Sequence, residues 1–432
     1  MTQPALPPGP RLPRPAQTLG WVTRPGPFLA KARKRYGDTF SVKIAQEGNW
    51  VMLTDPEDVQ TVFTGDPRLL HAGAANVVLL PLLGHHSVLL LDGEKHMAQR
   101  KLLLPPFHGK RMRGYEALMK DVANEEMERW PRGEPFALWP HMQAVTLEVI
   151  IRAVFGVRGD DRLDRMRTTL RETLELSTDM KTFLAVAALG PHRLDRMRFF
   201  QRQLDPVNEV LLDEIRDRRG ATDLDERDDI LSMLLGASHE DGSSMSDQEL
   251  RDELMTLLVA GHETTATALA WAIERLVRHP DKLHRLAEEA QAGENEYADA
   301  VCKETLRLRP VIPLVVRELQ EPMELGGHLL PAGARVTPCI LLIHRREDIY
   351  PEPNRFRPER FLEQPAGTYT WIPFGGGVRR CLGASFAMFE MKTVLQAVAT
   401  QLTLSPARPE AERVRRRAIT LTPSAGAQVV AA

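Results

Sequence analysis

One long helix between residues 246 and 279 constrains this chain of 432 residues more than any other feature. Ser246 and Glu249 form an S-x-x-E capping box at its start, and Pro280 marks its far end. About 33 residues at ~1.5 Å each give a helix of about 50 Å, which is long enough to cross a whole domain. Its centre, residues 257–261, is apolar on every side, so the sequence predicts a helix that is buried inside the protein.

Short strand-like segments flank a helical body. They lie at residues 39–44, 50–53, 334–337 and 418–421, and the residues between them show the 3.6-residue periodicity of helices. No repeat and no linker divides the chain. We therefore expect a single domain over residues 1–432, mainly α with small β-sheets. Its proline-rich start predicts an extended leader, which we place at residues 1–20.

Composition excludes several classes of protein. Lys and Arg number 56 against 58 Asp and Glu, a balance that argues against a dedicated nucleic-acid binder. The cysteines, Cys302, Cys339 and Cys381, lack paired spacing, which fits a reducing compartment and excludes a disulfide framework. No segment has the length and apolarity of a targeting signal or a membrane span. We therefore expect a cytoplasmic, soluble protein with neither nucleic acid nor membrane as a partner.

Polar residues follow the apolar centre of the long helix. Glu263 would be a buried carboxylate, which costs free energy unless it is paired or functional. The Thr264 hydroxyl can bond the carbonyl of Ala260 one turn back, and Gly261 weakens the helix there. These residues alone leave open a helix kink with satisfied polar groups and a catalytic pair. A zinc motif of the H-E-x-x-H type is excluded, because Ala266 stands at the second histidine.

The segment at residues 374–383 reads Phe-Gly-Gly-Gly-Val-Arg-Arg-Cys-Leu-Gly. Consecutive glycines let the backbone turn tightly and let a flat ligand approach closely. The dinucleotide pattern G-x-G-x-x-G fails, because Arg380 stands at its third glycine. Cys381 lies beside two arginines, just before a helical run from Ala384 to about Leu402. A helix N-terminus and nearby cations lower the pKa of a thiol, so the sequence predicts a thiolate; an inert buried cysteine and a nucleophile remain alternatives. For Cys302 and Cys339, a place in the core is the better interpretation.

This segment resembles the haem loop of the cytochrome P-450 family, the haem-thiolate monooxygenases. The family pattern F-G-x-G-x-R-x-C-x-G is matched at every fixed position, including Phe374, Gly375 and Gly383. The resemblance implies a haem b whose iron is held by the Cys381 thiolate, with Arg379 at a haem propionate. It also implies the P-450 fold, in which the haem is buried between the long oxygen-binding helix and the helix after the cysteine loop. Thiolate ligation favours O–O cleavage.

Other motifs follow in the family's order. Glu304 and Arg307 match its E-x-x-R motif, and Arg360 matches a later arginine; the resemblance implies that the three form a buried ion network with a structural role. The spacing alone is a weak signal, because most such pairs are solvated surface contacts. It recurs at Glu126/Arg129, Glu352/Arg355 and Glu410/Arg413.

The resemblance also assigns residues around the haem. His96 and Arg100, four residues apart on one helix face, and Arg317 match positions that bind haem propionates. The oxygen-binding motif A/G-G-x-D/E-T-T is met from Ala260 to Thr265. It places Ala260 and Gly261 at the haem, makes Thr264 the residue that stabilises bound dioxygen and relays protons, and makes Glu263 the nearby acid.

The resemblance implies a monooxygenase that uses O₂ and an apolar small molecule, such as a terpenoid, a steroid, a fatty acid or a macrolide-like compound. The chain has no flavin or ferredoxin motif, so electrons from NAD(P)H would come through a ferredoxin or flavodoxin and its reductase. We expect a monomer. The predicted partner surface is a basic cluster of Lys101, Lys110, Arg111, Arg113 and Arg380, although an ordinary solvated patch fits equally well. The predicted pocket residues are Val77, Leu80, Leu184, Leu257, Val311 and Leu314.

Two functions from other classes remain as alternatives. A haem sensor or electron carrier would also use a thiolate ligand, but it would not need Glu263 and Thr264. A cysteine or serine hydrolase would bind no haem.

Overall fold

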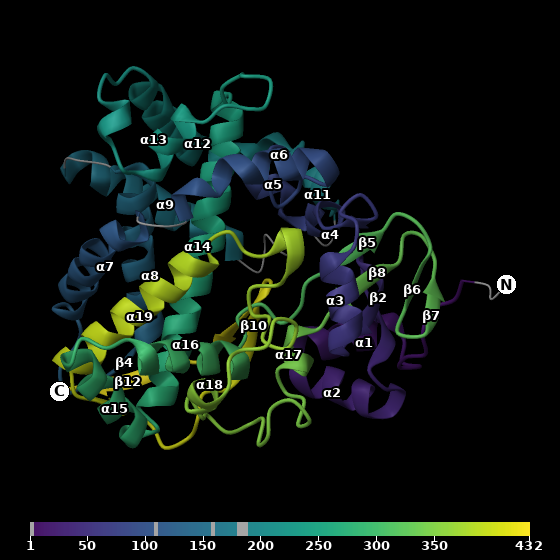
Figure 1. Ribbon diagram of the computed structural model, residues 1–432. Helices are drawn as coiled ribbons and strands as arrows, with labels where there is room; N and C mark the ends of the chain where they lie inside the picture. The colour runs from purple at the N-terminus through teal and green to yellow at the C-terminus, as the bar shows by residue number, and fades with distance from the viewer. Residues whose placement is uncertain (1–3, 108–110, 157–159, 179–188) are drawn as a thin grey trace.

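The computed structural model describes residues 4–107, 111–156, 160–178 and 189–432. Helices make up most of the described chain, and short strands gather mainly on one side (Figure 1). The expected fold class, mainly α with small β-sheets, is confirmed. None of the helices in these ranges combines the length and the apolarity that a membrane crossing requires.

The helices keep the labels of Figure 1. They are α1 (Arg14–Thr23), α2 (Pro25–Tyr36), α3 (Pro56–Thr64), α4 (Gly73–Asn76), α5 (Leu80–Leu83), α6 (Gly93–Leu103), α7 (Arg111–Met127), α8 (Leu138–Ile150), α9 (Asp160–Thr178), α11 (Pro191–Asp195), α12 (Arg198–Arg219), α13 (Ile230–Gly236), α14 (Asp247–Leu276), α15 (Pro280–Gln291), α16 (Glu296–Leu308), α17 (Ile340–Ile343), α18 (Arg360–Glu363) and α19 (Ala384–Gln401).

The strands of the described residues form four sheets. They are β1 (Thr39–Ile44), β2 (Gly48–Leu53), β3 (Leu70–His71), β4 (Pro135–Ala137), β5 (Arg317–Leu319), β6 (Met323–Leu325), β7 (His328–Leu330), β8 (Arg335–Pro338), β9 (Leu404–Pro406), β10 (Val414–Arg417), β11 (Thr420–Pro423) and β12 (Gln428–Ala431).

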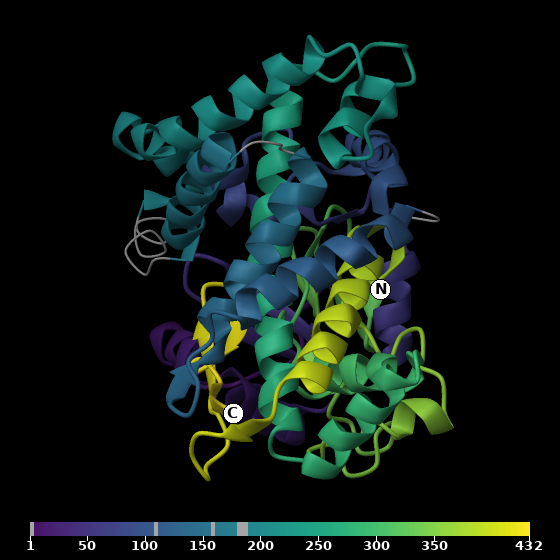
Figure 2. The same cartoon turned by 90° about the vertical axis from the view of Figure 1, so that its left-hand side faces the viewer.

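Helix α14 runs through the middle of the molecule and packs against α8, α12, α16 and α19 (Figures 1 and 2). The predicted capping box is confirmed: the N–H of Ser246 donates to Glu249 Oε2 at 2.7 Å, and the N–H of Glu249 donates to Ser246 Oγ at 3.2 Å. The helix ends at Leu276, short of the predicted residue 279. His279 precedes Pro280 and takes φ −134°, because proline disfavours the α-helical conformation of the residue before it.

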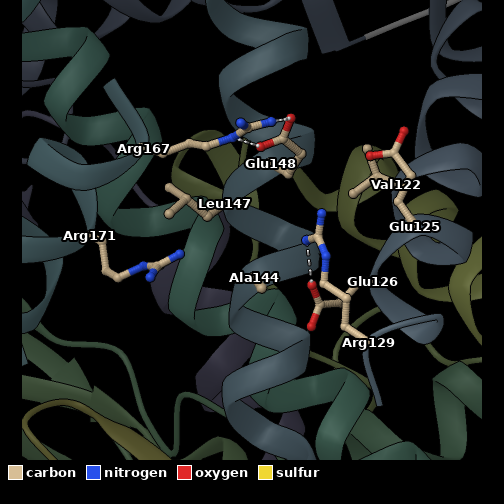
Figure 3. A pocket seen from close by; sticks show the side chains of 9 residues that line it. All are labelled: Val122, Glu125, Glu126, Arg129, Ala144, Leu147, Glu148, Arg167 and Arg171. Atoms are coloured by element: carbon tan, nitrogen blue, oxygen red, sulfur yellow. Dashed lines mark hydrogen bonds and ion pairs between the residues drawn. The ribbon is translucent and has the colours of Figure 1, made fainter. Parts of the chain in front are cut away.

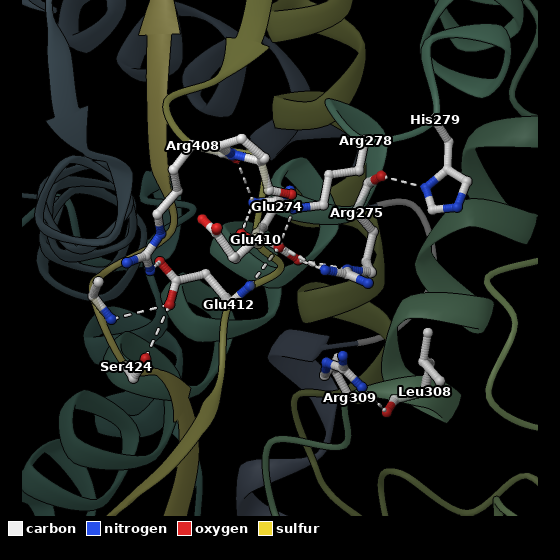
Figure 4. Close-up of polar contacts among 12 residues, drawn as sticks. Glu274, Arg275, Arg278, His279, Leu308, Arg309, Arg408, Glu410, Glu412 and Ser424 are labelled. Atoms are coloured by element: carbon white, nitrogen blue, oxygen red, sulfur yellow. Dashed lines mark hydrogen bonds and ion pairs between the residues drawn. The ribbon is translucent and has the colours of Figure 1, made fainter.

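A buried carboxylate fixes the C-terminal end of α14 to the last part of the chain (Figure 4). Glu274 accepts hydrogen bonds from Arg275 Nη2 at 2.6 Å and Arg278 Nε at 2.7 Å. It also accepts the backbone N–H of Glu412 at 3.1 Å. Arg278 in turn donates to Pro409 O at 2.7 Å. The segment that leads into strand β10 is therefore held on α14 by charged groups that are paired with each other.

The main sheet has the order β1-β2-β8-β5-β3, and its β2 and β8 are parallel, with Trp50 opposite Arg335. The predicted strands at 39–44 and 50–53 are confirmed within β1 and β2. The prediction at 418–421 is partly wrong. Ala418, at φ +48°, and Ile419 lie in the β10–β11 turn, and the strand starts at Thr420.

The leader is shorter than predicted, because helix α1 begins at Arg14. Pro15 lies in the first turn of α1, where proline has no N–H to leave unbonded and already has a helical φ. Residues before it follow the edge of the main sheet: the N–H of Ser41 donates to Pro8 O at 3.0 Å. A Cβ on Gly9 would lie 2.0 Å from Ser41 O, so the chain needs glycine there.

Candidate active site

Backbone hydrogen bonds hold the loop before Cys381. The N–H of Gly375 donates to Ile372 O, and the N–H of Cys381 donates to Phe374 O, both at 3.0 Å. Gly375 and Gly377 have φ angles of +66° and +62°, which glycine adopts without strain. The loop turns twice in this way before α19 begins, at Ala384 as predicted.

The protein's own helix α3 explains two of the glycines. A Cβ on Gly376 would lie 2.2 Å from Phe63 Cδ2, and one on Gly377 would lie 1.7 Å from Phe63 O. The sequence predicts that the consecutive glycines leave this loop without side chains so that a flat ligand can approach. At these two positions the close neighbour is α3 instead.

Cys381 differs from the other two cysteines. Cys302 and Cys339 are buried, as predicted for core residues, whereas Cys381 is exposed. Surrounding protein still crowds its thiol, and this desolvation raises the pKa of Cys381; the Gly383 N–H and the charges of Arg380 and Arg100 act in the opposite direction. The predicted lowering of the pKa is therefore wrong for the protein without an iron. A bound metal ion would hold the thiolate regardless of this shift.

Four basic side chains lie near one another beside the loop: His96 and Arg100 of α6, Arg317 of β5, and Arg379. Burial and the charges of the three arginines lower the pKa of His96 to about 3. Burial and the charge of Arg379 lower the pKa of Arg317 to about 10. The structure thus brings together every residue that was predicted to bind a propionate.

The carboxylate of Asp92 lies beside these basic side chains. Asp92 accepts a hydrogen bond from Arg379 Nη2 at 2.6 Å and also accepts the backbone N–H groups of residues 72–74. Arg379 further donates to Val88 O at 3.2 Å and to Leu91 O. Within the described ranges, neither Arg100 nor Arg317 has an ion-pair partner, and His96 Nδ1 and Arg379 Nε are buried without a hydrogen bond.

A buried excess of positive charge with free donors is unfavourable unless an anion joins it. The two propionates of a haem would supply such anions, next to the exposed residue Cys381. The residues present therefore fit the cofactor that the sequence implies. Asp92 had no signal of its own in the sequence, because its partner Arg379 lies far along the chain.

The middle of α14 is the second part of the site. Ala260 is exposed and Gly261 and Thr264 are half-buried, although the residues around them on the helix, such as Leu258 and Thr265, are buried. These positions are therefore the more accessible ones in this stretch of α14. The Thr264 hydroxyl donates to Ala260 O at 2.6 Å, as predicted.

The neighbours of this stretch explain two further residues. A Cβ on Gly261 would lie 3.0 Å from Ile150 Cδ1, so the glycine allows α8 to pack closely on α14. His262 is buried, and its Nε2 lies 3.1 Å from Gln143 O on α8. Burial lowers the pKa of His262 to about 4, so it is neutral at physiological pH. It lies against α8 as a packed side chain.

Glu263 is buried, and its Oε1 accepts a hydrogen bond from the Thr420 hydroxyl at 2.8 Å. Desolvation raises the pKa of Glu263, while this hydrogen bond and the charge of Arg417 act in the opposite direction. Thr420 is a residue that sequence reasoning missed. No spacing rule connects a threonine of the last hairpin to an acid in the middle of α14.

The predicted ion network forms as expected. Arg307 binds Glu304 through two bonds, Nε–Oε2 at 2.6 Å and Nη2–Oε1 at 2.9 Å, and all atoms of both side chains are buried. Arg360 Nε lies 3.1 Å from Glu304 Oε2, close enough for an ion pair but without hydrogen-bond geometry. Arg307 also donates to His344 O and Pro353 O, each at 2.8 Å.

The predicted pocket residues are spread over several elements. Val77, in a short 3₁₀ turn, is half-buried, Leu80 of α5 is buried, and Leu257 of α14 lies one turn before Ala260. Val311 is buried in the helical core. Leu314 packs against the cluster of α1, α2 and β1 side chains. Leu184 lies outside the described residues.

The predicted basic surface is visible only in part. The described part of the structure does not include Lys110 or the side chains of Arg111 and Arg113. Arg380 is exposed next to Cys381, whereas Lys101 forms an exposed ion pair with Glu240 at 2.6 Å. The positive charge of Lys101 is therefore partly neutralised.

A surface pocket between α7, α8 and α9 is unrelated to this site (Figure 3). Its acidic side chains already have partners: Glu148 accepts from Arg152 and Arg167, and Glu126 from Arg129. It is lined by Val122, Glu125, Glu126, Arg129, Ala144, Leu147, Glu148, Arg167 and Arg171. It contains none of the predicted site residues.

The fold and the site together define a haem-thiolate protein. An exposed cysteine lies just before helix α19, and four basic side chains with too few anionic partners lie beside it. A glutamate and a threonine lie next to each other on the central helix α14. The family model "Cytochrome P450" matches residues 7–429. A protein of Mycobacterium tuberculosis that carries the family name cytochrome P450 135B1 is 42% identical over 431 residues, covering 98% of this chain and 91% of its own. The protein with the name cytochrome P450 138, from the same organism, is 38% identical and covers 98% of this chain and 96% of its own.

A solved structure shows the same fold. The retinoic acid-bound cyanobacterial CYP120A1 superposes with a TM-score of 0.84 at 24% identity, over the full length of both chains. This chain belongs to the cytochrome P450 family. Family membership implies a thiolate-ligated haem, O₂ and monooxygenase activity.

Proposed function

We propose that this protein inserts one atom of O₂ into an apolar small molecule, using haem b and electrons that separate redox proteins carry from NAD(P)H. The second oxygen atom leaves as water, so each turnover consumes two electrons and two protons. The observation that carries this proposal is the exposed Cys381 beside four basic side chains, of which Arg379 pairs with Asp92, whereas Arg100 and Arg317 have no ion-pair partner in the described ranges. A cysteine or serine hydrolase would not require this group of basic side chains.

In this proposal Cys381 would hold the haem iron, and His96, Arg100, Arg317 and Arg379 would receive the propionates. Arg317 and Arg100 would gain their first anionic partners, which would offset their desolvation. When bound, the haem supplies the reduction and cleavage of O₂. Phe374, Gly375 and Gly383 would shape the loop beneath it.

Thr264 and Glu263 would relay and supply protons to the haem site from α14, where Ala260 and Gly261 would line the site. Because Thr264 donates its hydrogen to Ala260 O, its oxygen lone pairs are left to accept a hydrogen bond from a hydroxyl or a water beside this half-buried residue. Glu263 would supply the proton. Its raised pKa means that it binds a proton more readily than an ordinary glutamate, which suits a residue that must both take up and release one.

The substrate would be a terpenoid, a steroid, a fatty acid or a macrolide-like compound. The residues proposed to contact it, Val77, Leu80, Leu184, Leu257, Val311 and Leu314, are all apolar. The retinoic acid held by CYP120A1 is a guest of comparable character. A screen of such compounds for displacement of the iron-bound water would identify the class.

The electron donor would be a ferredoxin or a flavodoxin with its reductase. Arg380 is exposed beside the cysteine loop and would meet acidic groups of that partner. Association should then slow as ionic strength rises, since salt screens exposed charges. We also propose a monomer located in the cytoplasm.

The test is the absorbance of the purified, haem-loaded protein. The reduced carbon monoxide complex should show the red-shifted Soret band of thiolate ligation, and NADPH-driven oxygenation should follow with surrogate redox partners. Protein that binds no haem would contradict the proposal. Haem binding with the spectrum but without any oxygenation, for every compound in the screen, would favour a sensor or an electron carrier.

A further inference from the structure

The acid of the α14 pair has its hydrogen-bond partner on a different element. Glu263 Oε1 accepts from the Thr420 hydroxyl at 2.8 Å, where strand β11 begins. Both residues are buried, with exposed fractions of 8% and 4%. Across the described ranges, Thr420 is the one side chain that donates a hydrogen bond to Glu263.

The backbone of Thr420 is fixed by contacts that do not involve its hydroxyl. The indole Nε1 of Trp271, on α14, donates to Leu421 O at 2.9 Å, and the N–H of Leu421 donates to Val311 O at 2.8 Å. The hydroxyl is therefore not needed to hold β11 on α14. Its bond to Glu263 serves the carboxyl group.

The Thr420 hydroxyl has one hydrogen and two acceptors within reach. They are Glu263 Oε1 at 2.8 Å and Arg417 O at 2.9 Å. While Glu263 is ionised, Thr420 can donate to it. Once Glu263 carries a proton, the acid can donate to the threonine oxygen, and Thr420 can turn its own hydrogen to Arg417 O. One contact can therefore support both protonation states.

Adjacent positions on a helix point about 100° apart, so Glu263 is directed away from the face that Thr264 shares with Ala260. Delivery of a proton requires the carboxyl group to leave Thr420, or to pass the proton through an intervening group, and then to return. Arg417 is the charged group of the hairpin that acts on Glu263, and its guanidinium stacks on the Trp139 ring at 4.6 Å.

We propose that Thr420 is a positioning residue for oxygen activation, which holds Glu263 in its resting place and supports it with and without its proton. The C-terminal hairpin would thereby set the rate of proton supply to the haem site. This inference rests on the proposed monooxygenase function, and it adds a residue that the family motifs do not include.

Three variants of strand β11 separate the hydroxyl from the shape of the side chain. Thr420→Val removes the hydroxyl and keeps the volume, and Thr420→Ser keeps the hydroxyl. Thr422→Val is the matched control, because Thr422 is a buried threonine two residues along whose hydroxyl bonds Arg415 O at 3.3 Å. Far-ultraviolet circular dichroism and haem content would show that each variant is folded.

The first measurement is infrared difference spectroscopy of the carboxylic acid band of Glu263 during a pH titration, with Glu263→Gln to assign the band. We expect Thr420→Val to move the band to higher frequency and to move its titration to higher pH, since a buried carboxylate loses its donor. Thr420→Ser and Thr422→Val should match the wild type. An unchanged band in Thr420→Val would overturn the inference.

The second measurement is NADPH oxidation and peroxide release by the haem-loaded enzyme with a plant ferredoxin and its reductase, without added substrate. We expect Thr420→Val to slow NADPH oxidation about tenfold and to raise the share of electrons lost as peroxide. A moved band with unchanged rates, or equal losses in Thr420→Ser or Thr422→Val, would overturn the role of the hydroxyl. Failure of the proposed function itself would appear separately, as a wild type without the thiolate spectrum, while the infrared measurement still reads the Glu263–Thr420 contact.

Discussion

Removal of Arg307 should prevent the protein from reaching a stable, haem-loaded state. Arg307→Ala deletes two bonds to Glu304 and three to the carbonyls of His344, Pro353 and Arg355. Breaking a buried pair by removing one partner costs about 3–5 kcal/mol, and each carbonyl left without a donor adds about 1–3 kcal/mol. The sum is comparable to the total stability of an ordinary domain, about 5–15 kcal/mol.

The assay is soluble yield and haem content, followed by urea unfolding of whatever protein folds. Arg307→Lys keeps the charge but not the two-bond geometry, so it should give soluble protein with an unfolding free energy lowered by about 2–3 kcal/mol. Arg355→Ala is the control, because the Glu352–Arg355 pair has the same spacing, but its side chains are 63% and 67% exposed, respectively. It should cost less than about 0.5 kcal/mol. Normal yield and haem content of Arg307→Ala would refute the reasoning.

Three further predictions concern the site itself. Cys381→Ser should keep the fold, since the buried Glu304–Arg307 pair stabilises the core without the sulfur, but should lose the red-shifted band of the reduced carbon monoxide complex; survival of that band would show that Cys381 is not the ligand. Thr264→Ala should lower product per NADPH and raise peroxide with little change in substrate affinity, whereas Glu263→Gln should slow turnover as a whole; unchanged coupling in Thr264→Ala would exclude the proposed role. Asp92→Asn should lower the urea unfolding free energy of the haem-free protein by about 2–3 kcal/mol, because Arg379 and three N–H groups lose a charged acceptor, and an unchanged midpoint would contradict this.

Local rules succeed where the chemistry is local. The capping box at Ser246 and Glu249 needs only neighbouring residues, and so does the bond from Thr264 to Ala260 one turn back. The two-bond pair of Glu304 and Arg307 also follows from its spacing on α16, and its burial from the family motif. These features could be predicted without any knowledge of the packing.

Contacts between distant segments could not be predicted in this way. Asp92 meets Arg379 and Thr420 meets Glu263 only after the chain has folded, and neither pair has a spacing that a motif could express. The pKa of Cys381 was predicted in the wrong direction for the same reason: the nearby charges are visible in the sequence, but desolvation depends on the packing around the thiol.

The order of strands in the main sheet has a consequence for synthesis on the ribosome. Strands β1 and β2 form a hairpin early, but β2 receives its other neighbour, β8, only when residues 335–338 have been made. Until then β2 has an open edge, and the side chains of Val51 and Leu53, which are buried in the folded protein, are exposed on this strand. An open strand edge of this kind can pair with other chains. Pairing between segments so far apart also makes folding slow. The nascent chain therefore has its longest exposure to aggregation before the last quarter is complete, and an expression host with abundant chaperones should raise the yield of soluble protein more than a stronger promoter would.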